Sequence, residues 1–183
     1  MGKPYRNGCL KKKVQVQRQG TTISKKQPIQ LNSHSRHHFV IKPLSNFDLM
    51  EWVKRLGIKH FRGIYSRDGL PKKIKKKCGI INLDEMSGPG THWVCYRNLD
   101  SVVEYFDPFG LIMPNEVLKY FNTSGKPRVY SMDEIQNRNT VLCGYWCLYY
   151  LIERQQGFGI LDVIHNPHFD NGNSDFIKSY FGG

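Results

Sequence analysis

The sequence lacks the patterns that mark metal-binding and disulfide-stabilised proteins. It has no C-x-x-C pair, and His34, His37 and His38 fall in a polar stretch without the spacing of a four-ligand zinc site. Its five cysteines are an odd number and form no regular disulfide framework. The sequence therefore predicts no metal site and a reducing, intracellular setting.

Long apolar segments are also missing. The longest apolar run, residues 142–152, is far shorter than the roughly 20 residues that a helix needs to cross a bilayer. No apolar segment of the signal-peptide kind follows the first residues. We therefore expect neither a membrane segment nor secretion.

Acidic residues are absent from the first 42 positions. Residues 1–42 hold ten Lys and Arg, whereas residues 43–183 hold 17 basic and 15 acidic residues. The first segment has too few clustered apolar residues to bury enough surface and order itself. Over the whole chain, 39% hydrophobic residues are enough for a core. We predict a basic, flexible arm over residues 1–42 and one folded domain over residues 43–183.

Two groups of basic residues could neutralise phosphates, which would give salt-sensitive, sequence-independent binding to DNA or another polyanion. The alternatives are a solubilising or localisation tail for the first group and a solvated loop for the second. The first group is Lys11, Lys12, Lys13, Arg18, Lys25 and Lys26, and the second is Lys72, Lys73, Lys75, Lys76 and Lys77.

Hydrophobic periodicity in residues 43–183 predicts an α+β domain, with a central mixed or antiparallel sheet flanked by helices. Ser45 precedes an apolar helical pattern and Asp48 follows three residues later, which is typical of a helix start. The predicted helices cover residues 44–57, 114–121, a segment from 140 or 141 onward, and 173–181; the predicted strands cover 61–65, 78–83, 92–97, 102–107 and 128–132.

Residues 136–152 form a polar loop followed by an apolar helix with a cysteine near its start. A helix that begins at Thr140 or Val141 places Cys143 in its first turn, where free N–H groups and the helix dipole favour a thiolate. The same N–H groups could hydrogen-bond an oxyanion. The alternative is a buried structural cysteine, because free cysteines are often buried and Cys143 shares a helix face with Cys147. We assign Cys147 to the core.

A hairpin brings a histidine and a carboxylate together. A symmetric turn at residues 98–101 pairs residue 97 with 102 and 95 with 104, so that His92 faces Asp107. At that spacing a carboxylate can orient an imidazole and stabilise its charged form. Strand alternation puts Cys95 on the other face from His92, which argues against Cys95 as a nucleophile.

The residues His92, Asp107, Gln136 and Cys143 together supply a base, an orienting carboxylate, an amide donor and a nucleophile. His92 would accept the thiol proton, and Cys143 would attack an amide carbonyl to give a thioester that water hydrolyses. Gln136 and the Cys143 N–H would hold the oxyanion. This constellation predicts a cysteine protease.

Three ordered motifs resemble the adenovirus-type cysteine endopeptidases (adenain), which share a clan with the SUMO-deconjugating proteases. The resemblance covers about residues 45–181 and implies a papain-like fold. In that fold the nucleophile lies at the N-terminus of a buried helix, His92, Asp107 and Cys143 form a triad, and Gln136 lies in the oxyanion hole. The motifs are Gly90-Thr91-His92-Trp93, Tyr105-Phe106-Asp107-Pro108-Phe109-Gly110 and Gln136-x6-Cys143-Gly144-x2-Cys147.

The resemblance implies an endopeptidase that matures capsid and core proteins of a virus or a large DNA transposon by cutting at Gly-rich sites. It implies a virion and host-nuclear location, precursor proteins and DNA as partners, no cofactor for the chemistry, and activation by DNA and a basic peptide. The adenoviral enzymes bind that peptide through a cysteine near Arg128-Val129, which this chain lacks. We therefore expect no covalent activation by a peptide. We also expect a monomer, and the basic arm could take the place of the peptide in cis.

Two other functions stay open. The adenoviral enzymes have glutamate where this chain has Asp107, whereas the SUMO proteases have aspartate, so a deconjugating isopeptidase for SUMO-like or ubiquitin-like modifiers is the first alternative. The second is a non-enzymatic DNA-binding core protein on a retired protease fold.

Overall fold

The computed structural model describes residues 41–166, 169 and 173–182. Almost all of the predicted basic arm lies outside these residues. Lys11, Lys12, Lys13, Arg18, Lys25 and Lys26 therefore lie outside them as well, so the prediction for this group stays a prediction.

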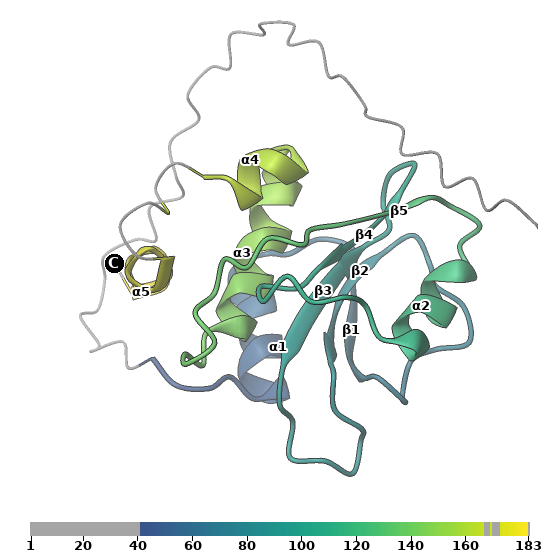
Figure 1. Cartoon of the computed structure of the whole chain (residues 1–183), viewed down its shortest axis with the longest axis horizontal. Coiled ribbons are helices and arrows are strands. Elements are labelled where there is room, and N and C mark those ends of the chain that lie inside the picture. The colour runs from purple at the N-terminus through teal and green to yellow at the C-terminus, as the bar shows by residue number, and fades with distance from the viewer. Residues whose placement is uncertain (1–40, 167–168, 170–172, 183) are drawn as a thin grey trace, which may run out of the picture. The chain divides into compact units, whose positions relative to one another are not determined.

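A five-stranded mixed sheet forms the centre of the domain, which confirms the predicted α+β class (Figure 1). Strand β1 is parallel to β2, β3 is antiparallel to both β2 and β4, and β5 is parallel to β4. The strands follow the chain order β1 (Phe61–Ser66), β2 (Cys78–Asn82), β3 (Trp93–Arg97), β4 (Val103–Phe106) and β5 (Arg128–Tyr130).

Helices cover both faces of this sheet. Cys95 and Phe106 point to the face covered by α1, α3, α4 and α5, whereas Tyr96 and Tyr105 point to the face covered by α2. Figure 1 shows α1 and α3 on one side of the sheet and α2 on the other. The helices are α1 (Asn46–Arg55), α2 (Asn115–Asn122), α3 (Cys143–Gln156), α4 (Ile160–Ile164) and α5 (Asn173–Gly182).

Helix α1 begins as predicted. The Ser45 hydroxyl accepts a hydrogen bond from Asp48 N at 3.2 Å, and the Asp48 carboxylate accepts one from Ser45 N at 2.9 Å. This reciprocal cap satisfies two backbone N–H groups that would otherwise lack a partner at the helix start. It fixes the chain just before α1, and that segment forms part of the site described below.

Helix α3 is the central element of the domain. Every residue from Cys143 to Ile152 is buried, which is typical of a helix that is apolar on all sides and packed in a core. The helix ends at Gly157, whose φ of 97° lies in the left-handed region that favours glycine. Among the described residues, no helix combines the length and apolarity required to span a bilayer.

A buried acid ties α3 to the sheet. Glu104 of β4 is 1% exposed, and its Oε1 accepts hydrogen bonds from Arg97 at 2.9 Å and from Arg154 of α3 at 2.6 Å. Its Oε2 accepts from the Tyr150 hydroxyl at 2.8 Å and from Arg154 Nε at 2.9 Å. Because both oxygens are fully paired, the cost of burying the charge is offset by four charge-assisted hydrogen bonds.

The predicted register of the β3–β4 hairpin is wrong by two residues. Arg97 pairs with Glu104 instead of residue 102, and Cys95 pairs with Phe106 instead of residue 104. The turn is longer than predicted because its residues are bound elsewhere: Asn98 N donates to Lys77 O, and Lys126 Nζ donates to Asp100 O. A shift of two residues keeps every side chain on its predicted face, since strand side chains alternate with a period of two.

Candidate active site

Cys143 is the first residue of α3, so the prediction that the helix begins at Thr140 or Val141 is wrong by two or three residues. Thr140 instead belongs to a turn, in which its N–H and its hydroxyl both donate to Asn137 O. The sulfur still lies in the first turn. Leu142, the residue before the helix, offers no side-chain cap, so the N–H groups at the start of α3 remain available to an anion.

His92 and Asp107 meet as predicted. His92 Nε2 lies 2.7 Å from Asp107 Oδ1, and the two side chains are buried, with Asp107 0% exposed. This contact survives the shifted register because the pair is diagonal rather than directly opposite. Continuing the observed register past β4 places His92 opposite Phe109.

Phe109 is a site residue that the sequence reasoning did not single out. Its ring stacks on the His92 imidazole with centroids 4.3 Å apart and planes 12° apart, and its N–H donates to Asp107 Oδ1 at 2.8 Å. The turn that makes this possible ends at Gly110, whose N–H bonds to Asp107 O and whose φ is 64°. A Cβ on Gly110 would lie 2.6 Å from Met132 O, so a side chain has no room there. The motif from Tyr105 to Gly110 was the available signal.

The ionisation of His92 is set by its two neighbours. Burial of the ring acts to lower the pKa of His92, but the hydrogen bond to Asp107 and the interaction with the Cys143 sulfur outweigh it and raise this pKa to about 9. The ring is therefore protonated at neutral pH. Its second nitrogen, Nδ1, is buried and has no hydrogen-bond partner among the described residues. Since Nε2 is held by Asp107, Nδ1 is the nitrogen left for Cys143 or a substrate.

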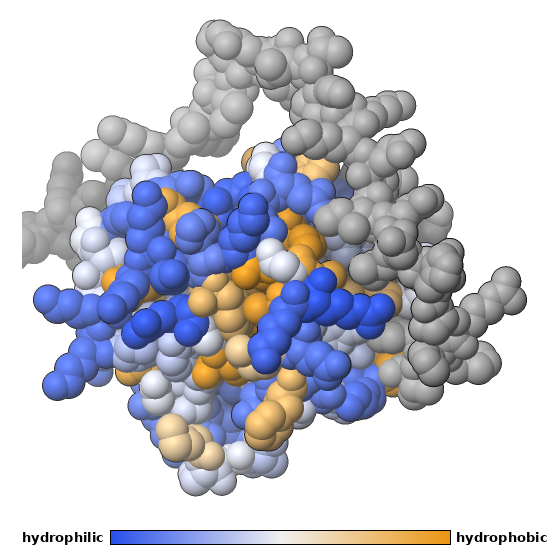
Figure 2. All heavy atoms as spheres, turned by 180° about the vertical axis from the view of Figure 1, so that it is seen from behind, coloured by the Kyte–Doolittle hydropathy of each residue, from blue (hydrophilic) through white to orange (hydrophobic). Residues whose placement is uncertain are grey.

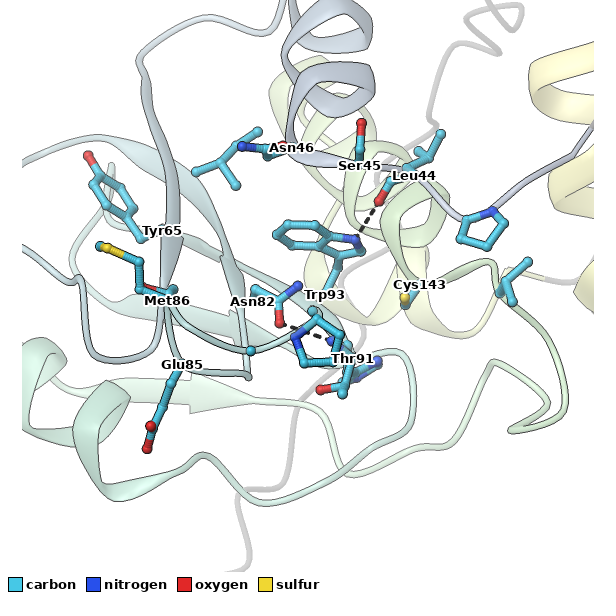
Figure 3. A pocket seen from close by; sticks show the side chains of 18 of the residues that line it. Leu44, Ser45, Asn46, Tyr65, Asn82, Glu85, Met86, Thr91, Trp93 and Cys143 are labelled. Carbon is cyan, nitrogen blue, oxygen red and sulfur yellow. Dashed lines mark hydrogen bonds between the residues drawn. The ribbon is translucent and has the colours of Figure 1, made fainter.

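A cleft of about 730 Å³ opens at Cys143, whose side chain points into it (Figure 3). On its wall, Trp93 Nε1 donates to Leu44 O at 2.9 Å, and Asn82 Oδ1 accepts from Thr91 N at 3.3 Å, so the segments on either side are fixed. The cleft is lined by Pro43, Leu44, Ser45, Asn46, Ile64, Tyr65, Ser66, Asn82, Glu85, Met86, Gly88, Pro89, Gly90, Thr91, His92, Trp93, Phe109, Arg138, Thr140, Val141 and Cys143.

Gln136 does not line this cleft. Its side chain is buried, with Nε2 donating to Thr140 O at 3.0 Å and Oε1 without a hydrogen-bond partner among the described residues. Gln136 thus holds the loop directly before Cys143. A primary amide has two N–H groups, so this bond leaves one for another acceptor. Its predicted place in an oxyanion hole stays a prediction.

Cys147 lies in the core, as predicted, and Cys95 is buried there as well. Both are 0% exposed, and burial raises the pKa of each thiol above its ordinary value. Their sulfur atoms contact backbone carbonyls, Cys95 that of Cys147 and Cys147 that of Trp93. A buried thiol of this kind is a poor nucleophile.

The lysines at positions 72–77 lie in the loop before β2. Lys72, Lys73, Lys75 and Lys76 are exposed and Lys77 is half-buried, whereas the loop backbone is fixed where Asn98 bonds to the carbonyls of Lys75 and Lys77. The face seen in Figure 2 carries mainly hydrophilic side chains with apolar residues between them.

Among the described residues, no three His, Cys, Asp or Glu side chains gather in a group that could hold a metal ion.

Similarity to known proteins is found among solved structures. No protein-family model and no curated protein matches this chain. A crystal structure of the ASFV pS273R protease is similar over 66% of this chain and 60% of that one, with 17% identity and a TM-score of 0.48. Its selenomethionine form is similar over 48% of this chain and 38% of that one, with 19% identity and a TM-score of 0.39. The chain thus spans less than two thirds of either structure, and likeness at this level says nothing about its chemistry.

Proposed function

We propose that this chain is a cysteine endopeptidase in which Cys143 is the nucleophile, His92 the acid–base residue and Asp107 its orienting carboxylate. One observation carries the proposal: a histidine held at 2.7 Å by a buried carboxylate lines the same open cleft as a cysteine at the start of a helix. Cationic neighbours and helix N-termini both stabilise thiolates, which are the reactive form.

The reaction follows from these positions. The Cys143 sulfur attacks the amide carbonyl carbon, and the N–H groups at the start of α3 stabilise the oxyanion. The C–N bond then breaks as protonated His92 gives its proton to the leaving amine. Neutral His92 next takes a proton from water, whose oxygen attacks the thioester. The acid leaves, and the sulfur and the protonated ring are restored.

The proposed substrates are precursor structural proteins of a virus or large DNA transposon, cut at Gly-rich sites in the virion and host nucleus. The three sequence motifs support this substrate class. The proposed DNA association is supported by the exposed lysines of residues 72–77 and by the basic composition of residues 1–42. Cys143 alkylation at graded pH, with and without DNA, would report whether DNA activates the thiol.

The function is tested with a panel of fluorogenic peptides that contain Gly-rich sequences. Wild-type protein is expected to cleave some of them, and Cys143→Ala is expected to cleave none. Cys147→Ala is the matched control, because it removes an equal side chain one helical turn away and is expected to keep the activity of the folded protein. Equal cleavage by wild-type protein and Cys143→Ala would refute the proposal.

A deconjugating isopeptidase is the second candidate, favoured by an aspartate at position 107. The same assay with SUMO-linked and ubiquitin-linked substrates separates the two. Efficient release of a whole modifier, with no cleavage of free Gly-rich peptides, would select the second candidate.

Gln136→Ala tests the proposed oxyanion role. Loss of one oxyanion donor lowers turnover by about 10²–10³-fold, whereas loss of a loop contact alone would affect mainly stability. Turnover and the melting temperature measured on the same sample distinguish these results.

A further inference from the structure

Asp107 has one carboxylate oxygen that its histidine does not use. Oδ1 accepts from both His92 Nε2 and Phe109 N, whereas Oδ2 is buried without a hydrogen-bond partner among the described residues. An unpaired buried oxygen on a charged group is unfavourable, and native proteins rarely leave one. A donor for this oxygen is therefore expected nearby.

Tyr105 is the donor in the right place. Tyr105 lies in β4 two residues before Asp107, which directly follows the strand, and side chains two residues apart in an extended chain project to the same side. Its hydroxyl is also buried without a partner of its own within the described part of the chain. Its ring is held by the edge of Phe121, with centroids 6.2 Å apart.

The electrostatics of the hydroxyl agree with this placement. Burial, and then the negative charge of Asp107, raise the pKa of Tyr105 well above its ordinary value. The hydroxyl therefore keeps its proton at all physiological pH values, and this proton is its only one to donate.

We propose that the Tyr105 hydroxyl donates a hydrogen bond to Asp107 Oδ2 and acts as a positioning residue for the His92–Asp107 pair. This inference rests on the proposed function and extends it, because it gives the carboxylate a fixed orientation from both sides: Phe109 and His92 hold Oδ1, and Tyr105 holds Oδ2. Tyr105 does not line the cleft, so it would act on the reaction only through Asp107.

The test compares two changes that each remove a single buried hydroxyl. Tyr105→Phe is expected to lower kcat and the rate of Cys143 alkylation by iodoacetamide about tenfold, the value of one hydrogen bond to a charged group, with KM unchanged. Tyr96→Phe is the matched control. Tyr96 is the partner of Tyr105 across β3 and β4, and its hydroxyl contacts that of Tyr120 instead. It is expected to leave both rates unchanged.

The same change in an Asp107→Asn background shows whether Tyr105 acts through the carboxylate. Tyr105→Phe should then have almost no further effect. An equal effect in both backgrounds, or wild-type rates in Tyr105→Phe, would overturn the proposal. Alkylation of Cys143, followed by mass spectrometry, reports on positioning even if no peptide is cleaved, so failure of the proposed function can be told apart. A crystal structure in which the Tyr105 hydroxyl bonds to another group would also overturn it.

Discussion

Two buried acids lie at opposite ends of one short stretch of chain, and they are treated in opposite ways. Glu104 has four hydrogen bonds to Arg97, Arg154 and Tyr150, which use both of its oxygens. Asp107, three residues later, accepts two hydrogen bonds on Oδ1, whereas Oδ2 has no recorded partner among the described residues and is the oxygen to which we assign the Tyr105 hydroxyl. The first lies between sheet and helix, and the second lies behind an open cleft.

The difference separates a structural ion cluster from a reactive one. Both Glu104 oxygens are already hydrogen-bonded, so this carboxylate has no capacity left for a further partner. Its role is structural, because its bonds to Tyr150 and Arg154 hold α3 on the sheet. Within the described part of the chain, His92 keeps one ring nitrogen, Nδ1, without a hydrogen-bond partner, and proton transfer to a substrate requires such a free nitrogen. Perturbed and incompletely satisfied groups in a cleft are typical of functional sites.

Removal of the histidine should have the largest effect on the reaction. His92→Ala is expected to lower kcat/KM by about 10⁴–10⁶-fold, because both the base and the proton donor are lost. Peptide cleavage measures this loss, and circular dichroism checks that the fold is kept. A loss of less than about tenfold would mean that the ring takes no part in the chemistry.

Asp107→Asn should come next. It keeps the shape of the side chain but removes the charge that orients His92, so kcat is expected to fall about 10²–10⁴-fold. The melting temperature should stay near that of wild-type protein. If instead the protein unfolds while its remaining folded fraction is fully active, Asp107 would belong with Glu104 as a structural acid.

Glu104→Gln should show the reverse pattern. Breaking a buried ion cluster by neutralising one member costs about 3–5 kcal/mol of unfolding free energy, since Arg97 and Arg154 are left partly unpaired. Denaturant unfolding measures this cost. Activity per folded molecule is expected to remain close to wild type, and a large drop in that quantity would remove the distinction between the two acids.

The smallest effect is the pH dependence. The pKa of His92 is raised to about 9, so the pair's stabilisation is complete below about 6.5, the ordinary histidine value, and is lost as pH rises through 9. Protonated His92 is also the proposed donor to the leaving amine, so kcat/KM should fall about tenfold per pH unit above 9. Arg154 of the Glu104 cluster keeps its charge over this range, because hydrogen bonding to Glu104 raises its pKa. A rate that stays constant up to pH 10.5 would contradict the assignment.

Much of the site could be predicted because its residues carry local signals. Ser45 and Asp48 specify a helix start by themselves, and the apolar run after Cys143 specifies a buried helix. His92 and Asp107 could be brought together by counting residues across one turn. That count was wrong by two, yet the contact formed, because an even shift leaves both side chains on the same face and long side chains reach a diagonal neighbour.

The remaining features depend on groups distant in sequence. The turn at residues 98–102 lengthens because Lys77 and Lys126 bind its backbone, and no local pattern records those partners. The Gln136 side chain is held by the Thr140 carbonyl, and the Phe109 ring that stacks on His92 lies beyond the end of β4.

By itself the sequence determined which residues could react, because side-chain chemistry, strand alternation and helix caps are local properties. Only the tertiary structure decided which of the two nearby acids pairs with arginines and which pairs with His92. That choice depends on the arginines of β3 and α3 reaching Glu104, whereas no arginine of the described residues pairs with Asp107. It is made by packing across the sheet rather than by any one stretch of chain.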